Sequence, residues 1–464
     1  MKPMTLERVA EWAGGVLSGG ESGSVVVRVS TDSRQSLAGA LFVPLVGERH
    51  DAHDFLPQAF AGGAVAALSA RDGAAEAGPL IRVDDTLMAL QRLATRYRAS
   101  LDPFVAVGVT GSNGKTSTKD FLKAVLARRH RVHATLGNLN NHIGVPLTVL
   151  GVEAEHTAGV FEMGMNHFGE IAPLAAIAQP DIAVVTNIGT AHIEFLGSRE
   201  GIALEKGRLV EAVPAGGFVV LNADDDMTPG LAARARAPVV TAGLSGGAVR
   251  AEAVEGTSFD LRLPDALLVR VTLPVPGRHM ISNALLAAAV GWRLGFSPDE
   301  IREGLETAVL QGGRLQHRTV AGLRILDDSY NANPDSMVAA LRTLRGEKVG
   351  GRRLAVLGRM GELGPQTAAG HRAVGEAAAA EGVDFLLTVG DDDSRLIHEA
   401  FGDAARSRRC ATHAEAAAWL RAEATGADLV LLKGSRSAAM EKVLLNLEAA
   451  TPDGAGAKPP TSEH

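Results

Sequence analysis

The 464-residue sequence contains a single cysteine, Cys410, so a disulfide framework is excluded. A chain without disulfides suits a reducing compartment, and we expect a cytoplasmic protein in which Cys410 is an ordinary core or surface residue. Aromatic residues are also scarce, at 4%, whereas hydrophobic residues make up 46% of the chain. The core must therefore be built mainly from alanine, valine, leucine and isoleucine.

Long apolar runs and a strong positive charge are missing as well. No stretch reaches the ~18 uninterrupted apolar residues of a membrane span, and the N-terminal MKPMTLERVAEWAGG carries charges where a signal peptide needs an apolar region. We expect neither membrane insertion nor secretion. The net charge of −7 provides no general attraction to nucleic acid. The tail 451–464 is rich in polar and small residues and is expected to be disordered.

The length exceeds what one hydrophobic core can organise, and the apolar runs divide the chain into three segments. Residues 1–98 mix short β-like runs with helical patches and predict a small α/β domain. Residues 99–313 alternate continuous apolar strands with amphipathic helices, which is typical of a parallel sheet covered on both faces. A second alternating series over 314–450 predicts a Rossmann-like α/β domain.

The central segment opens with VGVTGSNGKTSTKDFL, residues 107–122, where an apolar strand leads through a glycine-containing loop into a helical pattern starting at Lys115. Helix N-termini favour phosphate, Lys115 can neutralise its charge, and the Thr116 hydroxyl can bind Mg²⁺. Val109 replaces the usual first glycine, which argues against a generic GTPase. A glycine turn that only caps a helix is the alternative. The expected ATP-binding residues of the loop are Thr110, Gly111, Ser112, Asn113, Gly114, Lys115, Thr116 and Ser117.

Further motifs follow this loop in a fixed order. They are GNLNNHIGVPLTVL (137–150), FEMGMNHFGEI (161–171), TNIGTAHIEFLGS (186–198), DDSYNANPDSM (327–337), GRMGELG (358–364) and LLKGSRSAAMEKV (431–443). Together with TGSNGKTSTK they resemble the Mur ligases, the ATP-dependent amide-forming enzymes of peptidoglycan synthesis, and their folylpolyglutamate synthase relatives. The resemblance extends from about residue 30 to residue 445. It implies a UDP-sugar domain, a central P-loop ATP domain and a C-terminal domain that closes over the nucleotide.

The motifs favour one reaction within this family, the joining of D-alanyl-D-alanine to UDP-N-acetylmuramoyl-tripeptide. The ligase that adds diaminopimelate carries an Asp-Asn-Pro-Arg motif, whereas NANPDS (331–336) has no arginine after its proline. Another Mur-type amino-acid ligase or a folylpolyglutamate synthase relative stays an alternative. A P-loop ATPase or switch without ligation chemistry is the alternative from another class.

The implied reaction activates a carboxylate as an acyl phosphate, so two anions must be brought together with the help of Mg²⁺ and a lysine. Glu162 ends a predicted strand at the sheet edge that binds ligands, although a solvated or helix-capping glutamate fits the pattern too. The resemblance implies that Thr116, Glu162 and His192 hold Mg²⁺, with His192 at a second ion. It also implies that Lys206 is carbamylated, although by itself Lys206 fits a solvated helix face. The expected catalytic residues are Lys115, Lys206 and His192.

The resemblance also supplies the remaining site residues. It places Asn283, Arg314 and Asp328 at the nucleotide, although Asn283 also fits a helix N-cap and Asp328 a strand-end turn. Ser33 and Arg34 are expected at the UDP-sugar, because arginine suits bidentate phosphate contact, and a plain polar strand end is the alternative. The other substrate-binding candidates are Asn138, Asn331, Asn333, Ser435 and Arg436. We expect a monomer whose partners are ATP and the two substrates.

Overall fold

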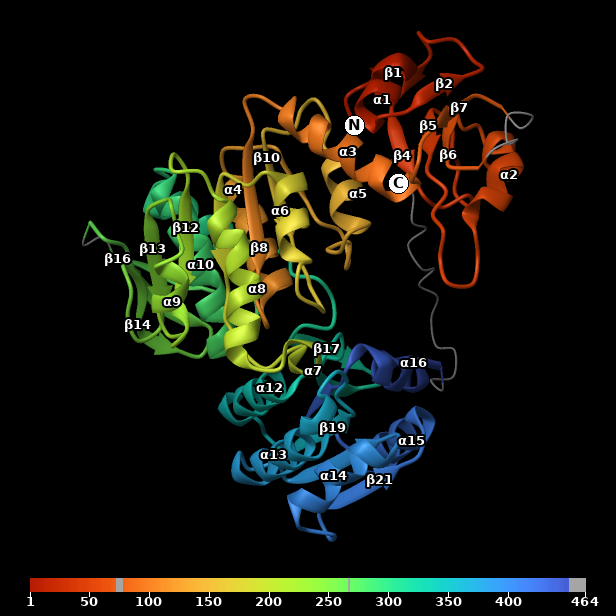
Figure 1. Ribbon diagram of the computed structural model, residues 1–464. Helices are drawn as coiled ribbons and strands as arrows, with labels where there is room; N and C mark the ends of the chain where they lie inside the picture. Colours follow the sequence, from red (N-terminus) through yellow and green to blue (C-terminus); the bar gives the residue numbers. More distant parts are fainter. Residues whose placement is uncertain (72–77, 266–267, 450–464) are drawn as a thin grey trace.

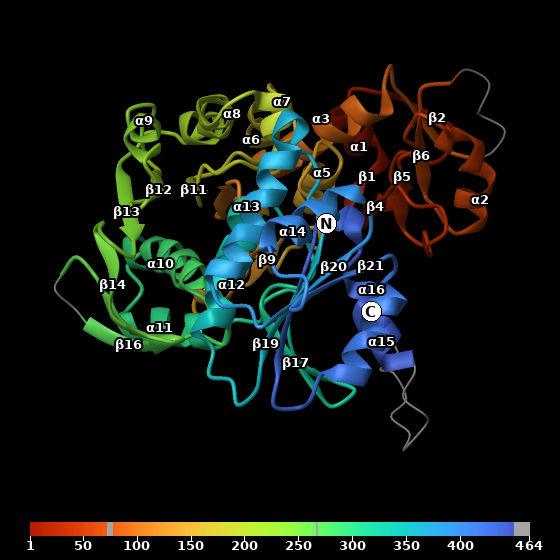
Figure 2. The ribbon, with the colours of Figure 1, turned by 90° about the horizontal axis from the view of Figure 1, so that it is seen from below.

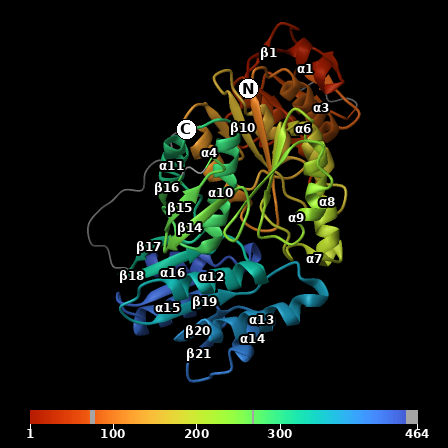
Figure 3. The same ribbon diagram turned by 90° about the vertical axis from the view of Figure 1, so that its left-hand side faces the viewer.

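The computed structural model of the protein describes residues 1–71, 78–265 and 268–449, so the tail predicted to be disordered lies outside the described residues. The chain forms three α/β bodies, and the central one lies between the N-terminal and C-terminal ones (Figures 1 and 3). Each predicted segment contains its own main sheet, and the predicted fold class is confirmed. The boundaries near 98 and 313 stay predictions. Among the described residues, no helix is long and apolar enough to cross a membrane.

The N-terminal segment forms, within its described residues, a five-stranded sheet of order β2-β7-β6-β5-β4. Strands β4 to β7 pair in parallel, while β2 pairs antiparallel with β7. Helix α3 packs against α1 on one side and against helices α5 and α6 of the central segment on the other. The elements are β1 (Met4–Thr5), α1 (Leu6–Ala13), β2 (Val16–Ser18), β3 (Val25–Val26), β4 (Arg28–Ser30), β5 (Ala40–Phe42), η1 (Ala52–Phe55), α2 (Leu56–Ala61), β6 (Ala66–Ser69), β7 (Leu80–Arg82) and α3 (Thr86–Ala99).

The central segment is organised around a sheet of order β16-β15-β14-β13-β12-β11-β8-β10-β9, counted over the described residues. From β9 to β14 the strands are parallel, as predicted, and β15 and β16 add an antiparallel extension that the sequence did not indicate. The elements are β8 (Val105–Thr110), α4 (Lys115–Leu126), β9 (Val132–Ala134), α5 (Gly144–Leu150), β10 (Ala158–Glu162), α6 (Ile171–Ala178), β11 (Ile182–Val185), α7 (Ile193–Leu196), α8 (Arg199–Ala212), β12 (Phe218–Asn222), α9 (Thr228–Ala232), β13 (Val239–Gly243), β14 (Val249–Glu255), β15 (Ser258–Arg262), β16 (Leu268–Thr272), α10 (Arg278–Arg293) and α11 (Pro298–Glu306).

The C-terminal segment forms a six-stranded sheet within the described range, of order β17-β18-β22-β19-β20-β21. Only β17 runs antiparallel to its neighbour. In the view from below this body lies nearest the viewer (Figure 2). The elements are β17 (Gln316–Val320), β18 (Leu323–Asp328), α12 (Pro334–Gly346), β19 (Arg353–Gly358), η3 (Gly364–Gln366), α13 (Thr367–Ala380), β20 (Phe385–Val389), α14 (Asp392–Phe401), β21 (Ser407–Cys410), α15 (His413–Glu423), β22 (Leu429–Lys433), η4 (Arg436–Ala438) and α16 (Glu441–Ala449).

Helix α4 is the part of the core that positions the site. Its apolar residues Phe121, Leu122, Val125 and Leu126 are fully buried, and α10 and α11 pack against it. Each such side chain stabilises the fold by about 1.5–3 kcal/mol through removal from water. The helix N-terminus is thereby held at the carboxyl end of β8, between β10 and β11.

Candidate active site

A cavity of about 1160 Å³ lies between the central and C-terminal bodies. Its walls are loops that leave the carboxyl ends of parallel strands, which is where open α/β sheets bind ligands. The predicted residues that line it are Ser112, Asn113, Gly114, Lys115, Thr116, Ser117, Asn138, Glu162, His192, Asn283, Arg314, Asp328, Asn331, Asn333, Ser435 and Arg436. The predicted residues outside this lining are Ser33, Arg34, Thr110, Gly111 and Lys206.

The phosphate loop joins β8 to α4, which begins at Lys115 as predicted. Gly114 has a φ of 79°, and a Cβ there would lie 2.3 Å from the Asn283 Oδ1 atom. A Cβ at Gly111, where φ is 151°, would lie 1.8 Å from the Thr186 hydroxyl oxygen. Both glycines are therefore required by close neighbours as well as by backbone conformation. Within the loop, the Ser112 N–H donates to Asn187 O at 2.9 Å and the Asn113 N–H donates to Asn187 Oδ1 at 3.0 Å.

Two lysines converge on one carbonyl behind the loop. Lys115 Nζ donates to Gly111 O at 2.8 Å, and Lys206 Nζ donates to the same oxygen at 3.0 Å. Lys206 is fully buried, so the interpretation as a solvated helix face is wrong. Burial, with the neighbouring Lys115 charge, holds the pKa of Lys206 well below its usual value. Burial lowers the pKa of Lys115 too, against the opposing pull of Glu162.

Glu162 is buried at the end of β10 and is bound on both of its oxygens. Thr116 Oγ1 donates to Glu162 Oε2 at 2.8 Å, and Asn140 Nδ2 donates to Glu162 Oε1 at 2.8 Å. Arg314 Nη2, from the far side of the cavity, donates to the same Thr116 hydroxyl at 2.8 Å. Asn140 lies in the same motif as the exposed Asn138, whose expected contact with substrate stays a prediction. The Thr116 hydroxyl, the Glu162 carboxylate and the Arg314 guanidinium thus lie together at the first turn of α4.

His192 lies before α7 with a φ of 64° and is oriented by the C-terminal body. Its Nδ1 lies 2.7 Å from Glu362 Oε2, and this proximity lowers the pKa of Glu362. Glu362 follows β19 and also has a positive φ, 61°. Glu362 lies in the GRMGELG motif, but no local pattern in the sequence indicates that it pairs with His192. The contact uses Nδ1, so Nε2 is the ring nitrogen of His192 that does not contact Glu362.

The N-terminus of α12 docks on the central body. Asn333 caps this helix and its Nδ2 donates to Asn113 Oδ1 of the phosphate loop at 2.7 Å. Asp335 Oδ2 accepts from both the backbone N–H and the hydroxyl of Thr190, each at 3.0 Å. Sequence reasoning missed Asp335 and Thr190, because partners 145 residues apart in the chain show no local pattern.

The predicted nucleotide residues differ in what holds them. Asn283 lies well inside α10, which begins at Arg278, so the N-cap interpretation is wrong. Asp328 accepts from Lys433 Nζ at 2.5 Å and from the Leu315 N–H at 3.2 Å, and burial raises its pKa. The guanidinium of Arg314 also stacks over the Tyr330 ring at 4.3 Å. By binding the backbone of Leu315, Asp328 thus helps to hold the neighbouring Arg314 in place.

The substrate candidates fall into two separate groups. In the cavity, Asn331 Oδ1 accepts from the Arg436 N–H at 3.2 Å, and the buried Ser435 hydroxyl lies 3.1 Å from that of Ser437. In the N-terminal body, the Arg34 side chain is 85% exposed and forms a bidentate pair with Asp32. Hydrogen bonds from Arg34 lower the pKa of Asp32 to about 2. The alternative for Arg34 was a plain polar strand end. The structure shows a loop in which Arg34 forms an ion pair with Asp32.

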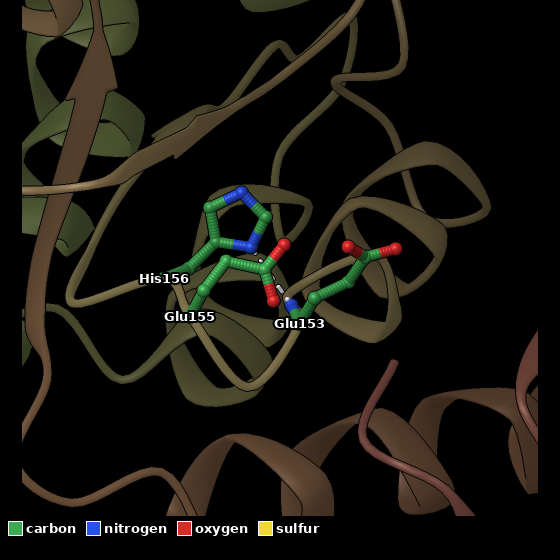
Figure 4. A group of neighbouring side chains, drawn as sticks. All are labelled: Glu153, Glu155 and His156. Atoms are coloured by element: carbon green, nitrogen blue, oxygen red, sulfur yellow. Dashed lines mark hydrogen bonds between the residues drawn. The ribbon is translucent and has the colours of Figure 1, made fainter. Parts of the chain in front are cut away.

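One further group of potential metal ligands lies outside the cavity. Glu153, Glu155 and His156 lie together on the turn before β10 (Figure 4), with possible ligand atoms within 4.8 Å of one another. The two glutamates are exposed, and His156 Nδ1 accepts from the Glu153 N–H at 2.9 Å. The histidine therefore already stabilises the turn, and none of the three lines the candidate site.

Comparison with known proteins agrees with the geometry. The Mur ligase middle domain family matches residues 109–291, and the family described as Mur ligase, glutamate ligase domain matches residues 313–436. The UDP-N-acetylmuramoyl-tripeptide–D-alanyl-D-alanine ligase of Escherichia coli is 39% identical over 465 residues, covering 97% of this chain and 99% of its own. That of Bacillus subtilis is 36% identical over 452 residues, covering 96% and 98%.

Solved structures agree with the sequence relatives. A crystal structure of MurF from Acinetobacter baumannii has a TM-score of 0.89 at 33% identity, covering 96% of this chain and 99% of its own. MurF from Thermotoga maritima in complex with ADP has a TM-score of 0.81 at 28% identity, covering 91% and 97%. The predicted resemblance is confirmed over nearly the whole chain. This protein belongs to the Mur ligase family of ATP-dependent, amide-forming ligases.

Proposed function

We propose that this protein joins D-alanyl-D-alanine to UDP-N-acetylmuramoyl-tripeptide, forming UDP-N-acetylmuramoyl-pentapeptide, ADP and phosphate. The observation that carries the proposal is the end-to-end similarity to ligases bearing that name, with the phosphate loop and the NANPDS motif facing one cavity. The proposed division of labour is UDP-sugar binding by residues 1–98, ATP binding by 99–313 and closure by 314–450. A cytoplasmic monomer is part of the same proposal.

ATP phosphates would lie on the N–H groups at the start of α4, where the helix dipole favours negative charge. Lys115 would exchange the Gly111 carbonyl for a phosphate oxygen, and Arg314 would approach the same phosphates from the C-terminal side. Asn283, against the loop at Gly114, and the cavity-lining Asp328 are proposed at the base and ribose.

The oxygen donors of the site suit Mg²⁺, which prefers carboxylate and hydroxyl ligands. Thr116 Oγ1 and Glu162 Oε2, 2.8 Å apart and buried, would hold the first ion, and His192 Nε2 would face a second. Bound Mg²⁺ would withdraw charge from the phosphates. The lowered pKa of Lys206 favours the neutral amine, which is the form that adds to CO₂ to give a carbamate.

The chemistry proceeds in two displacements. A carboxylate oxygen of the tripeptide attacks the γ-phosphorus, and the bond to ADP breaks. The D-alanyl-D-alanine amine then attacks the acyl carbon, and the tetrahedral intermediate collapses as phosphate leaves. The dipeptide would lie near Asn331, Asn333, Ser435 and Arg436, and the UDP moiety near Ser33 and Arg34, while Asn138 would contact substrate in the cavity. The contacts of α12 with the central body would exclude water, which otherwise hydrolyses the acyl phosphate.

Phosphate release from Mg·ATP, measured with and without each substrate beside mass detection of the product, tests this proposal. We expect release that needs both substrates and matches the pentapeptide formed. Release without either substrate would support an ATPase instead. Release supported by a single amino acid would point to another Mur-type ligase.

A further inference from the structure

A buried carboxylate that the proposed reaction does not use fastens the interdomain linker to helix α4. Asp120 is 6% exposed, and its Oδ2 accepts from the Gln311 backbone N–H at 3.0 Å. Its Oδ1 accepts from Lys119 Nζ at 2.7 Å, and Lys119 is 2% exposed. Charged pairs are costly to bury, so this pair calls for a role beyond general stability.

The linker runs beside α4 from Asp120 to Thr116. These two residues are one helical turn apart and therefore lie on the same face, about 6 Å apart along the axis. Gln311 is bound at Asp120, and three residues later Arg314 donates to Thr116. Three residues can span at most about 10 Å, so the segment from Gln311 to Arg314 is long enough to follow α4 over this turn.

Gly312 and Gly313 follow the anchored Gln311, and the Gly313 carbonyl accepts from the Tyr330 N–H of the C-terminal body at 3.2 Å. Gly313 has a φ of 71°, a conformation that favours glycine. The chain is fixed again immediately afterwards, because the Leu315 N–H donates to Asp328 Oδ1 at 3.2 Å. Before the glycines, the Gln311 N–H is fixed by Asp120. The short segment between these two bonds carries Arg314 and joins the central body to the C-terminal body.

We propose that Asp120 is a positioning residue that anchors Gln311 so that closure of the C-terminal body delivers Arg314 to Thr116 and the bound phosphates. Lys119 balances the buried charge and holds the carboxylate in place. The inference rests on the proposed function for its kinetic consequence, while the anchoring itself is a property of the fold.

Two double variants, one that keeps a hydrogen-bond acceptor at position 120 and one that lacks it, test the proposal. Lys119→Met with Asp120→Asn removes both charges and keeps an acceptor for the Gln311 N–H, whereas Lys119→Met with Asp120→Leu removes the acceptor. We expect the Asn variant to keep wild-type kcat and the Leu variant to lose about tenfold to a hundredfold, as for a slightly misplaced catalytic group. Similar melting temperatures and UDP-substrate affinities would exclude a folding defect. Equal kcat values would overturn the proposal.

Combination with Arg314→Ala separates positioning from general stabilisation. If Asp120 acts through Arg314, the two double variants should have the same kcat once Arg314 is alanine. A persistent difference of the original size would overturn the proposal, because the acceptor would then act independently of Arg314.

Hydrogen exchange of the peptide covering residues 308–315 provides a readout without turnover. The Leu variant should exchange faster than the Asn variant there, and both should match elsewhere in α4. If the two variants exchange equally fast in this peptide, Asp120 does not anchor Gln311, whatever the ligation activity of the variants. Faster exchange in a protein that makes no pentapeptide would preserve the anchor and reject the proposed function.

Discussion

The phosphate loop and the loop at Ser33 and Arg34 are both glycine- or polar-rich segments at a strand end, yet the structure holds them in opposite ways. The phosphate loop contacts α10, the residues that follow β11 and, through Asn333, the C-terminal body. The N-terminal loop satisfies itself, since Arg34 pairs with Asp32 only two residues away and stays 85% exposed. A site built across two bodies depends on how those bodies are arranged, whereas the loop at Ser33 and Arg34 is held by contacts within itself.

Lys115→Ala should give the largest effect on ligation, and it should leave the function of the N-terminal loop unchanged. We expect ligation to fall by about a thousandfold or more, because the charge on the transferred phosphate loses its cation. Binding of the UDP-substrate, measured by calorimetry, should be unchanged. Lys123→Ala, an exposed lysine on the same helix, is the matched control. Loss of UDP-substrate binding would contradict the division of labour between the bodies.

Glu162→Gln should have the next largest effect. It preserves shape but removes the charge that faces Thr116, so kcat should fall about a hundredfold and the Mg²⁺ concentration for half-maximal rate should rise. A Mg²⁺ titration of initial rates measures both. Glu153→Gln in the exposed turn is the control and should behave as wild type. An unaltered Mg²⁺ dependence in Glu162→Gln would exclude Glu162 as a ligand.

Asp335→Asn tests the contact between the bodies. The carboxylate oxygen that accepts twice from Thr190 loses its charge, and charge-assisted hydrogen bonds contribute about 1.5–3 kcal/mol, so kcat should fall about tenfold. The KM for the UDP-substrate should stay unchanged in steady-state assays. Asp392→Asn, whose side chain is 90% exposed, serves as control. A wild-type kcat would mean that this contact does not limit closure.

Arg34→Ala should give the smallest effect and one confined to the other region. We expect the KM for the UDP-substrate to rise by up to about tenfold, since a bidentate phosphate contact is lost. The kcat, the KM for ATP and the melting temperature should stay constant, because an exposed ion pair stabilises little. Arg8→Ala on α1 controls for general loss of positive charge. A raised KM for ATP would show that the two regions are coupled.

The sequence was most informative where chemistry and local geometry coincide in a short stretch. The strand, the glycines and the helix that begins at Lys115 all follow from VGVTGSNGKTSTKDFL, because phosphate binding of this kind needs contiguous residues. The sequence did not predict the environment of a residue whose neighbours come from distant elements. Lys206 fits a surface helix in sequence, but the structure buries it behind Gly111.

The sequence by itself determined the family, the α/β class and the residue types gathered at the cavity, since these depend on motifs and on the periodicity of apolar residues. Only the tertiary structure decided how they are joined: Glu362 with His192, Asp335 with Thr190, and Asp120 with Gln311. Each pair links residues far apart in the chain. The first two distances depend on how the central and C-terminal bodies pack, and the third depends on how the linker lies against α4; no local pattern of residues encodes that packing.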